Sequence, residues 1–124
     1  ERIQDRKKNL SVFYKQICFE SYAADIEVEN IGMKLLWNDL KFEFIESLGH
    51  TDGSMCILVG SNLFTGDTII KNHKTVIKFP TGNKEKLISS INKLNSKVND
   101  RHVYVYPGHG EGFYLDEITF EQIV

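Results

Sequence analysis

The sequence has few cysteines and prolines, no long apolar run and no excess of positive charge. Its 124 residues include two cysteines, two prolines and one tryptophan, and the formal net charge is -2. No run reaches the roughly 18 apolar residues typical of a membrane-spanning helix, and the first residues do not resemble a signal peptide. A chain without a basic block is a poor candidate for binding nucleic acid or a membrane surface. We therefore expect a cytoplasmic protein with no nucleic-acid and no membrane partner.

Both cysteines lie in apolar segments, Cys18 in QICFE and Cys56 in SMCILV. Scarce cysteines in such surroundings favour buried free thiols, as in cytosolic proteins, with a disulfide or a ligand pair as the alternative. Hydrophobic residues make up 41% of the chain and charged residues 26%, which is ordinary for a globular protein. The length predicts one domain over residues 1–124.

Alternating apolar residues and turn signals predict strands in the first half of the chain. The segment ADIEVEN at 24–30 alternates acidic and aliphatic residues, which is typical of a half-buried strand. Residues 32–37 and 40–47 flank the turn-forming pair Asn38-Asp39, so we expect a hairpin there. A second hairpin is expected around Ser61-Asn62. Its first arm, MCILV, is entirely apolar and predicts a central, buried strand.

Helical patterns come later. Asn83 is a good N-cap, and the residues after it that recur at helical spacing are Leu87, Ile88, Ile91, Leu94 and Val98. A short strand is expected within 101–107, ending at a proline, and an amphipathic helix over 115–124. Hairpins followed by helix, strand and helix predict an α/β (α+β) fold, a sheet with helices on one side.

Three glycine-flanked turns carry the candidate functional residues. His50 and His109 each follow a glycine after an apolar segment, and Asp67 lies in the turn TGDT. Glycine lets a backbone turn tightly, so side chains on separate loops can converge. Two imidazoles and a carboxylate suit zinc. The alternative is that all three are ordinary turn residues, which is our interpretation of His73 and His102 as surface or structural histidines.

The ordered motifs LGHTDGS, LFTGDT and YPGHGEG resemble those of the metallo-β-lactamase fold superfamily, and the glyoxalase II-like (hydroxyacylglutathione hydrolase-like) branch most of all. The resemblance implies an αββα sandwich, of which this chain supplies mainly the C-terminal half, one sheet with its helices. It also implies that His50 binds a first zinc ion and His109 a second, and that Asp67, the catalytic residue, bridges the two. The aspartate stands where class B1 lactamases place a cysteine, which argues against an antibiotic-hydrolysing enzyme.

The family resemblance also predicts the reaction. Two metal ions, zinc or else iron or manganese, would activate a bridging hydroxide that attacks an ester or thioester of a small molecule. Two alternatives stay open, a non-catalytic binding or scaffolding relative and a phosphodiesterase of the same fold. The family's second motif, HxHxDH, is absent from the sequence. We therefore expect this fragment alone to be inactive and to pair with a missing N-terminal half or form a homo-oligomer.

Two further departures from the family pattern concern the substrate. The segment IIKNHKTVIKFPTG replaces the Gly-Arg that often follows the TGDT turn, which leaves substrate contacts there open. The glutathione-binding helical tail of glyoxalase II enzymes is not visible in the sequence. The resemblance therefore carries no expectation of specificity for glutathione thioesters.

Overall fold

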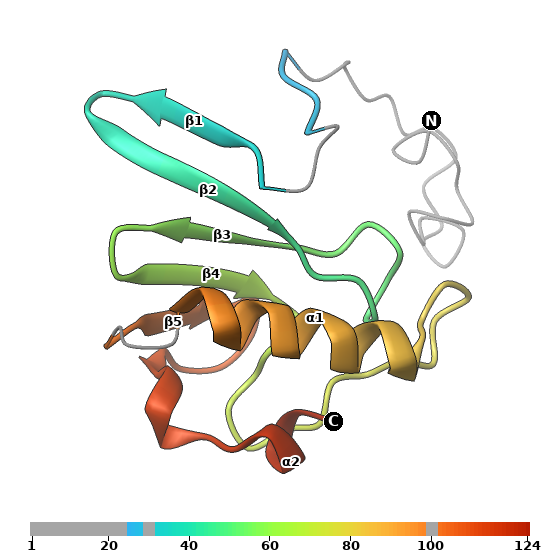
Figure 1. The fold of residues 1–124 in the computed structure, drawn as a ribbon. Coiled ribbons are helices and arrows are strands. Elements are labelled where there is room, and N and C mark those ends of the chain that lie inside the picture. The colour runs from blue at the N-terminus through green and yellow to red at the C-terminus, as the bar shows by residue number, and fades with distance from the viewer. Residues whose placement is uncertain (1–24, 29–31, 99–101) are drawn as a thin grey trace, which may run out of the picture.

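The computed structural model describes residues 25–28, 32–98 and 102–124, which form a mixed sheet with helical segments beside it (Figure 1). The sheet has six strands in the order β1-β2-β3-β4-β5-β6. Their bounds are β1 Lys34–Trp37, β2 Leu40–Glu46, β3 Met55–Val59, β4 Asn62–Gly66, β5 Tyr104–Pro107 and β6 Phe113–Tyr114. Neighbouring strands are antiparallel except β4 and β5, which are parallel. Helix α1, Lys84–Val98, makes the crossover between these two. The predicted α/β class is confirmed.

Both predicted hairpins are present. Asn38 and Asp39 connect β1 to β2 with φ of 47° and 63°, the left-handed pair that a tight hairpin turn requires. The second turn lies one residue earlier than expected, because Gly60, with φ of 60°, takes the left-handed position and Asn62 already pairs with Val59. The apolar strand β3 is central, between β2 and β4.

Two expected elements differ from the prediction. Residues 25–28 of the segment 24–30 form a bend and not a strand, so alternation alone did not produce sheet pairing there. The predicted helix over 115–124 is a 3₁₀ turn, Leu115–Glu117, and a short helix α2, Phe120–Ile123. Ile118 between them is extended, with φ of -126° and ψ of 151°. The β-branched pair Ile118-Thr119 favours this break, and Thr119 then caps α2.

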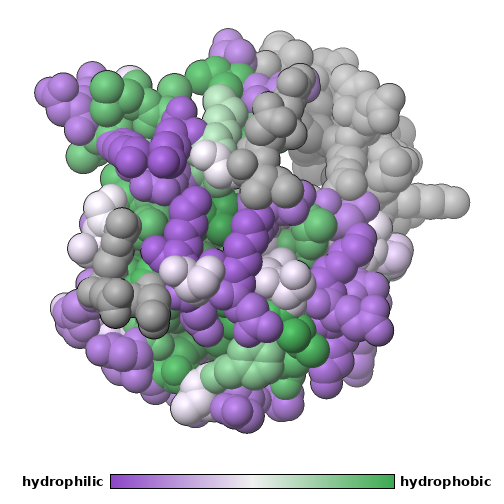
Figure 2. Space-filling model, viewed as in Figure 1, coloured by the Kyte–Doolittle hydropathy of each residue, from purple (hydrophilic) through white to green (hydrophobic). Residues whose placement is uncertain are grey.

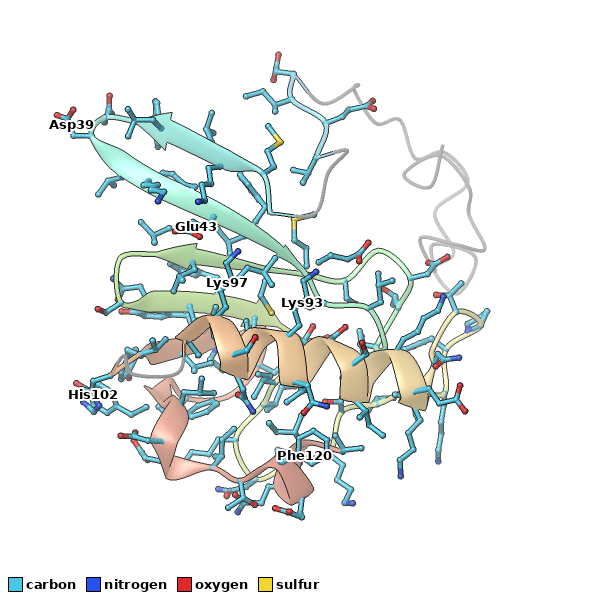
Figure 3. All side chains as sticks on the ribbon, viewed as in Figure 1. Asp39, Glu43, Lys93, Lys97, His102 and Phe120 are labelled. Carbon is cyan, nitrogen blue, oxygen red and sulfur yellow. The ribbon has the colours of Figure 1, made fainter. Side chains whose placement is uncertain are left out.

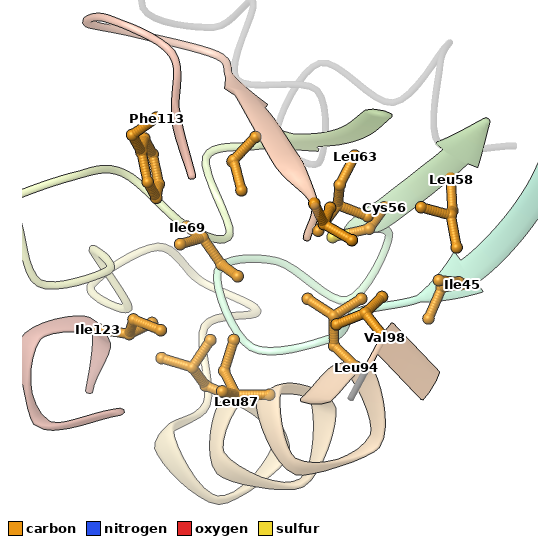
Figure 4. Packing of buried hydrophobic residues seen from close by; sticks show 13 residues of the cluster. Ile45, Cys56, Leu58, Leu63, Ile69, Leu87, Leu94, Val98, Phe113 and Ile123 are labelled. Atoms are coloured by element: carbon orange, nitrogen blue, oxygen red, sulfur yellow. The ribbon is translucent and has the colours of Figure 1, made fainter. Parts of the chain in front are cut away.

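The core lies between α1 and one face of the sheet (Figure 4). Asn83 accepts a hydrogen bond from the Lys86 amide at 2.9 Å, which confirms the predicted N-cap. Four of the predicted apolar helix residues are buried, and Ile88 is half-buried. The sheet contributes alternate side chains, namely Ile45, Cys56, Leu58, Leu63 and Val105. The same alternation sends the intervening side chains to the opposite face.

The outer face of α1 is polar, and hydrophilic side chains cover much of the molecule on that side (Figure 2). Lys97 of α1 and Glu43 of β2 point toward each other (Figure 3), with 3.6 Å between Nζ and Oε2. This ion pair joins the helix to the far part of the sheet above the buried layer. Among the described residues, no helix is long and apolar enough to cross a membrane.

Candidate metal centre

Three turns meet at one edge of the sheet because three strands run in the same direction. β2 and β4 are each antiparallel to β3, and β5 is parallel to β4. The C-terminal ends of β2, β4 and β5 therefore lie at the same edge, as the arrowheads of β2 and β4 show in Figure 1. His50, Asp67 and His109 lie in the turns that follow these three strands. The topology thus brings together residues up to 59 positions apart, as their numbers 50 and 109 show.

The carboxylate of Asp67 lies between the two imidazoles. Its Oδ2 atom is 3.7 Å from Nε2 of His50 and 3.5 Å from Nε2 of His109. The exposed fractions of the side chains are 16% for His50, 32% for Asp67 and 75% for His109, so the group opens from a covered side toward solvent. All three line the same cleft. The structure brings together the three residues that the sequence predicts.

The donor types of this group suit a metal ion. Two nitrogens and a carboxylate are donors that zinc accepts. Within the described residues, no group of three or more histidine, cysteine, aspartate or glutamate side chains is arranged to hold one metal ion. Because zinc sites hold three or four protein ligands around one ion, these three side chains do not form a complete site in this arrangement.

The orientation of His50 is set by a backbone contact. Its Nδ1 atom lies 2.7 Å from the carbonyl oxygen of Val76. Because a carbonyl only accepts hydrogen bonds, Nδ1 is the donor in this contact, and Nε2 points toward Asp67. The Phe79 ring packs against the imidazole edge to face, with 5.0 Å between centroids. His50 is thus held with Nε2, the nitrogen left for a metal ion, directed into the group of three residues.

The turn that carries His50 is fastened to the start of α1. The Asn83 amide donates to the Gly49 carbonyl at 2.8 Å, and Ser90 Oγ donates to the Leu48 carbonyl at 2.8 Å. Gly49 adopts φ of 140°, and a Cβ there would lie 2.4 Å from Cβ of Leu87. Only glycine allows this close approach, so the glycine before His50 is required by packing against the helix.

The cleft has a volume of about 610 Å³ and a wall that the sequence did not predict. This wall consists of residues 70–74, Val76 and Phe79. Asn72 has φ of 62°, and the His73 amide donates to the Ile70 carbonyl at 3.3 Å, so the chain reverses here in a tight turn. The Lys-Asn-His sequence after an apolar pair was the available signal for this turn.

Both remaining histidines are exposed, as their interpretation as surface residues predicts. His73 also lines the cleft. His102 stacks on Tyr114 with 3.9 Å between ring centroids and lies 3.3 Å from Asp116, away from the cleft. Its exposed position beside β6 is visible in Figure 3.

Buried polar groups behind the cleft serve the fold. Thr65 Oγ1 donates to the Ile69 carbonyl at 2.9 Å, and Thr75 Oγ1 donates to the Thr68 carbonyl at 2.7 Å. Cys56 is a free, buried thiol, as the sequence predicts. Burial raises the pKa of Cys56 to about 11, although hydrogen bonds with Ser47 and Thr68 lower it in part. Such a thiol is neutral and unreactive. Cys18 lies outside the described residues.

Residues 2–109 match the model of a protein family described as the metallo-beta-lactamase superfamily. The chain belongs to the metallo-beta-lactamase superfamily. The match covers most of the sequence and includes all three turns of the candidate metal centre. Membership agrees with the mixed sheet and with the position of the cleft at the ends of β2, β4 and β5.

The chain is also similar to proteins of known sequence or structure. It is 43% identical over 70 residues to a probable metallo-hydrolase of Methanocaldococcus jannaschii, covering 56% of this chain and 34% of that protein. It is 39% identical over 64 residues to the probable polyketide biosynthesis zinc-dependent hydrolase PksB of Bacillus subtilis, covering 52% of this chain and 28% of that protein. The crystal structure of ETHE1 from Myxococcus xanthus superposes with a TM-score of 0.67 at 28% identity, covering 76% of this chain and 43% of that one. The chain spans about a third of the length of the curated relatives it matches.

Proposed function

We propose that the chain forms part of a metal-dependent hydrolase and contributes His50, Asp67 and His109 to its dinuclear centre. The observation that carries the proposal is the position of Asp67 Oδ2, within 3.7 Å of Nε2 of both histidines. Relatives named as a probable metallo-hydrolase and as a zinc-dependent hydrolase support the same class of reaction. We take zinc as the first metal to test, with iron and manganese as the other candidates.

Each of the three residues has a distinct role in this proposal. Asp67 would hold both ions, and His50 and His109 would each hold one from opposite sides. When bound, the metals supply Lewis-acid chemistry and lower the pKa of coordinated water toward neutrality. The Val76 carbonyl holds the Nδ1 side of the His50 imidazole, which leaves Nε2 directed at Asp67. The half-buried position of His50 limits the competition from bulk water.

We propose an ester or thioester of a small molecule as the substrate, as in the glyoxalase II-like branch. The cleft supports this through its size and its mixed lining of apolar and cationic side chains, among them Val76, Phe79, Lys71 and Lys74. Lys71 also pairs with Glu117, so its position at the rim is fixed. Lys78 is not among the lining residues.

Zinc titration by calorimetry, with three ligand variants, tests the metal centre. We expect His50→Gln, Asp67→Asn and His109→Gln each to weaken zinc binding at least tenfold, with Asp67→Asn the most severe because it affects both ions. His102→Gln is the matched control, since His102 is exposed and lies outside the cleft. Equal zinc affinity in the ligand variants and the control would contradict the proposed centre.

Turnover measurements distinguish a hydrolase from a non-catalytic binding module. Hydrolysis of thioester, ester and phosphodiester model compounds is measured for the 124-residue chain and for the longest natural protein that contains it. We expect weak zinc binding and little turnover from the chain alone, because it offers about two ligands per ion. Zinc-dependent thioester or ester hydrolysis by the longer protein would support the proposal. Tight zinc binding without turnover of any compound would instead indicate a non-catalytic relative.

A further inference from the structure

The segment 76–83 contacts the turn of His50 at several points along its length. At its start, the Val76 carbonyl lies 2.7 Å from His50 Nδ1. In its middle, the Phe79 ring packs on the imidazole at 5.0 Å between centroids, with an interplanar angle of 79°. We call residues 76–83 the clasp. The clasp contacts the Nδ1 side of the imidazole ring, whereas Asp67 lies on the Nε2 side.

The far end of the clasp is fixed to the same turn. Thr81 Oγ1 accepts a hydrogen bond from the Asp52 amide at 3.2 Å, and the Asn83 amide donates to Gly49 at 2.8 Å. The clasp also closes on itself, because the Gly82 amide donates to the Phe79 carbonyl at 2.8 Å. A Cβ at Gly82 would lie 2.1 Å from the Ile77 carbonyl oxygen, so this turn is as tight as a glycine permits. The backbone that carries Phe79 is therefore closely held.

Phe79 does not belong to the hydrophobic cluster of the described residues. That cluster includes Ile77 and Phe120 among its partly buried members, and Phe79 is absent from it. Instead the Phe79 ring lines the cleft and contacts His50. Phe79 thus packs on a candidate metal ligand and is not one of the core residues.

We propose that Phe79 is a positioning residue that, together with the Val76 carbonyl, holds the His50 imidazole with Nδ1 at that carbonyl and Nε2 directed at Asp67. The inference rests on the proposed function, because the position of His50 matters for a metal site. The positioning itself can be measured on the metal-free chain. The carbonyl selects the tautomer, and the aromatic ring keeps the imidazole in the plane that lets the carbonyl bond form. Loss of the ring would leave the carbonyl in place and free the imidazole to turn away from it.

The test compares Phe79→Leu with Phe120→Leu, the same change at a half-buried phenylalanine that packs against the core. Long-range ¹H–¹⁵N correlation spectra of the metal-free protein report which nitrogen of each histidine carries the proton, and the His50→Gln spectrum assigns His50. We expect wild type and Phe120→Leu to show one His50 tautomer with the proton on Nδ1. Phe79→Leu should show a mixture of tautomers, and Phe79→Tyr, which keeps the ring, should restore the single form.

Zinc affinity is the second measurement. We expect Phe79→Leu to bind zinc about tenfold more weakly than wild type and Phe120→Leu to match wild type, in line with the effect of residues that orient metal-bound histidines. An unchanged single tautomer in Phe79→Leu would overturn the inference, as would the same mixture in Phe120→Leu. If wild type binds no zinc, the proposed function fails, and the tautomer spectra still decide whether Phe79 positions His50.

Discussion

The amide nitrogen of Gly108 donates a hydrogen bond to the carbonyl oxygen of Gly66, with 2.8 Å between the two atoms. This bond joins the turn after β5 to the turn after β4, beyond the point where the regular register between the strands shifts. It places Asp67 and His109, the residues that follow each glycine, on neighbouring turns. The distance between their side chains is therefore determined by the backbone of the sheet edge.

Gly108 is also a close neighbour of the Asp67 carboxylate. A Cβ at position 108 would lie 2.4 Å from Oδ1 of Asp67 and 3.1 Å from the Gly66 carbonyl carbon. We predict that Gly108→Ala displaces the Asp67 side chain and weakens zinc binding at least tenfold. The loss of stability should stay within about 1 kcal/mol, because the end of a side chain can rotate away.

The control for this prediction is Gly60→Asn in the β3–β4 turn. No atom lies within 4 Å of a Cβ at Gly60, and asparagine tolerates its φ of 60°. Calorimetry and thermal unfolding measure the two effects separately. Zinc affinity that is unchanged in Gly108→Ala would show that Asp67 does not need its present position.

Gly49 should respond in the opposite way, with a loss of stability as the main effect. A Cβ at position 49 would meet backbone atoms of α1, at 2.5 Å from Cα and 2.6 Å from N of Leu87, and these cannot rotate away. The φ of 140° adds backbone strain for any other residue. We predict that Gly49→Ala lowers the free energy of unfolding by at least about 2 kcal/mol. Urea unfolding checks this, and a cost below that of Gly108→Ala would contradict it.

The sequence was sufficient to predict the central part of the fold and the three candidate ligands. Asn38-Asp39 marked the first hairpin and Asn83 the start of α1, because left-handed turns and N-caps are local properties of a few residues. Asp67 and the two histidines were identified as a group from their glycine-flanked turns and from the order of three motifs, since no local spacing connects residues on separate turns. Their convergence follows from the shared direction of β2, β4 and β5.

The cleft wall could not be predicted, because its residues have no periodicity. His73 is exposed as expected, and only the tight turn at Asn72 shows that it lies at the cleft. The contact of Phe79 with His50 depends on the path of the whole clasp, which no local pattern predicts. Similarly, the C-terminal helix was predicted from amphipathic spacing, whereas the extended Ile118 interrupts it.

Because the Cys56 thiol is buried, we predict that the protein loses stability at alkaline pH. Burial raises its pKa from 9.0 to about 11, so between these values the unfolded chain releases a proton that the native chain keeps. The contribution of the neutral thiol to the free energy of unfolding is complete below pH 9 and is lost as the pH rises through 11. The difference between the two pKa values corresponds to about 3 kcal/mol, at 1.36 kcal/mol per pKa unit. Urea unfolding at pH 8 and pH 11 in a Cys18→Ser background measures it. A Cys56→Ala variant is the control, and an equal alkaline loss in that variant would assign the effect to other groups.

We predict that the chain associates with a partner through the face of the sheet opposite α1. Phe64 and Tyr106 stack there at 5.0 Å between ring centroids and are 43% and 42% exposed, and Ile57 and Phe44 continue the row across β3 and β2. We propose that this face pairs with a second copy of the chain or with another part of the metal-dependent hydrolase, because an apolar row of this extent is usually covered. Light scattering should give a mass above that of a monomer for the 124-residue chain, and Phe64→Glu should reduce it. Leu36→Glu, at an exposed residue of the β1–β2 hairpin that lies on the α1 side of the sheet, should leave the mass unchanged. A monomeric wild-type chain at high concentration would exclude pairing with a second copy.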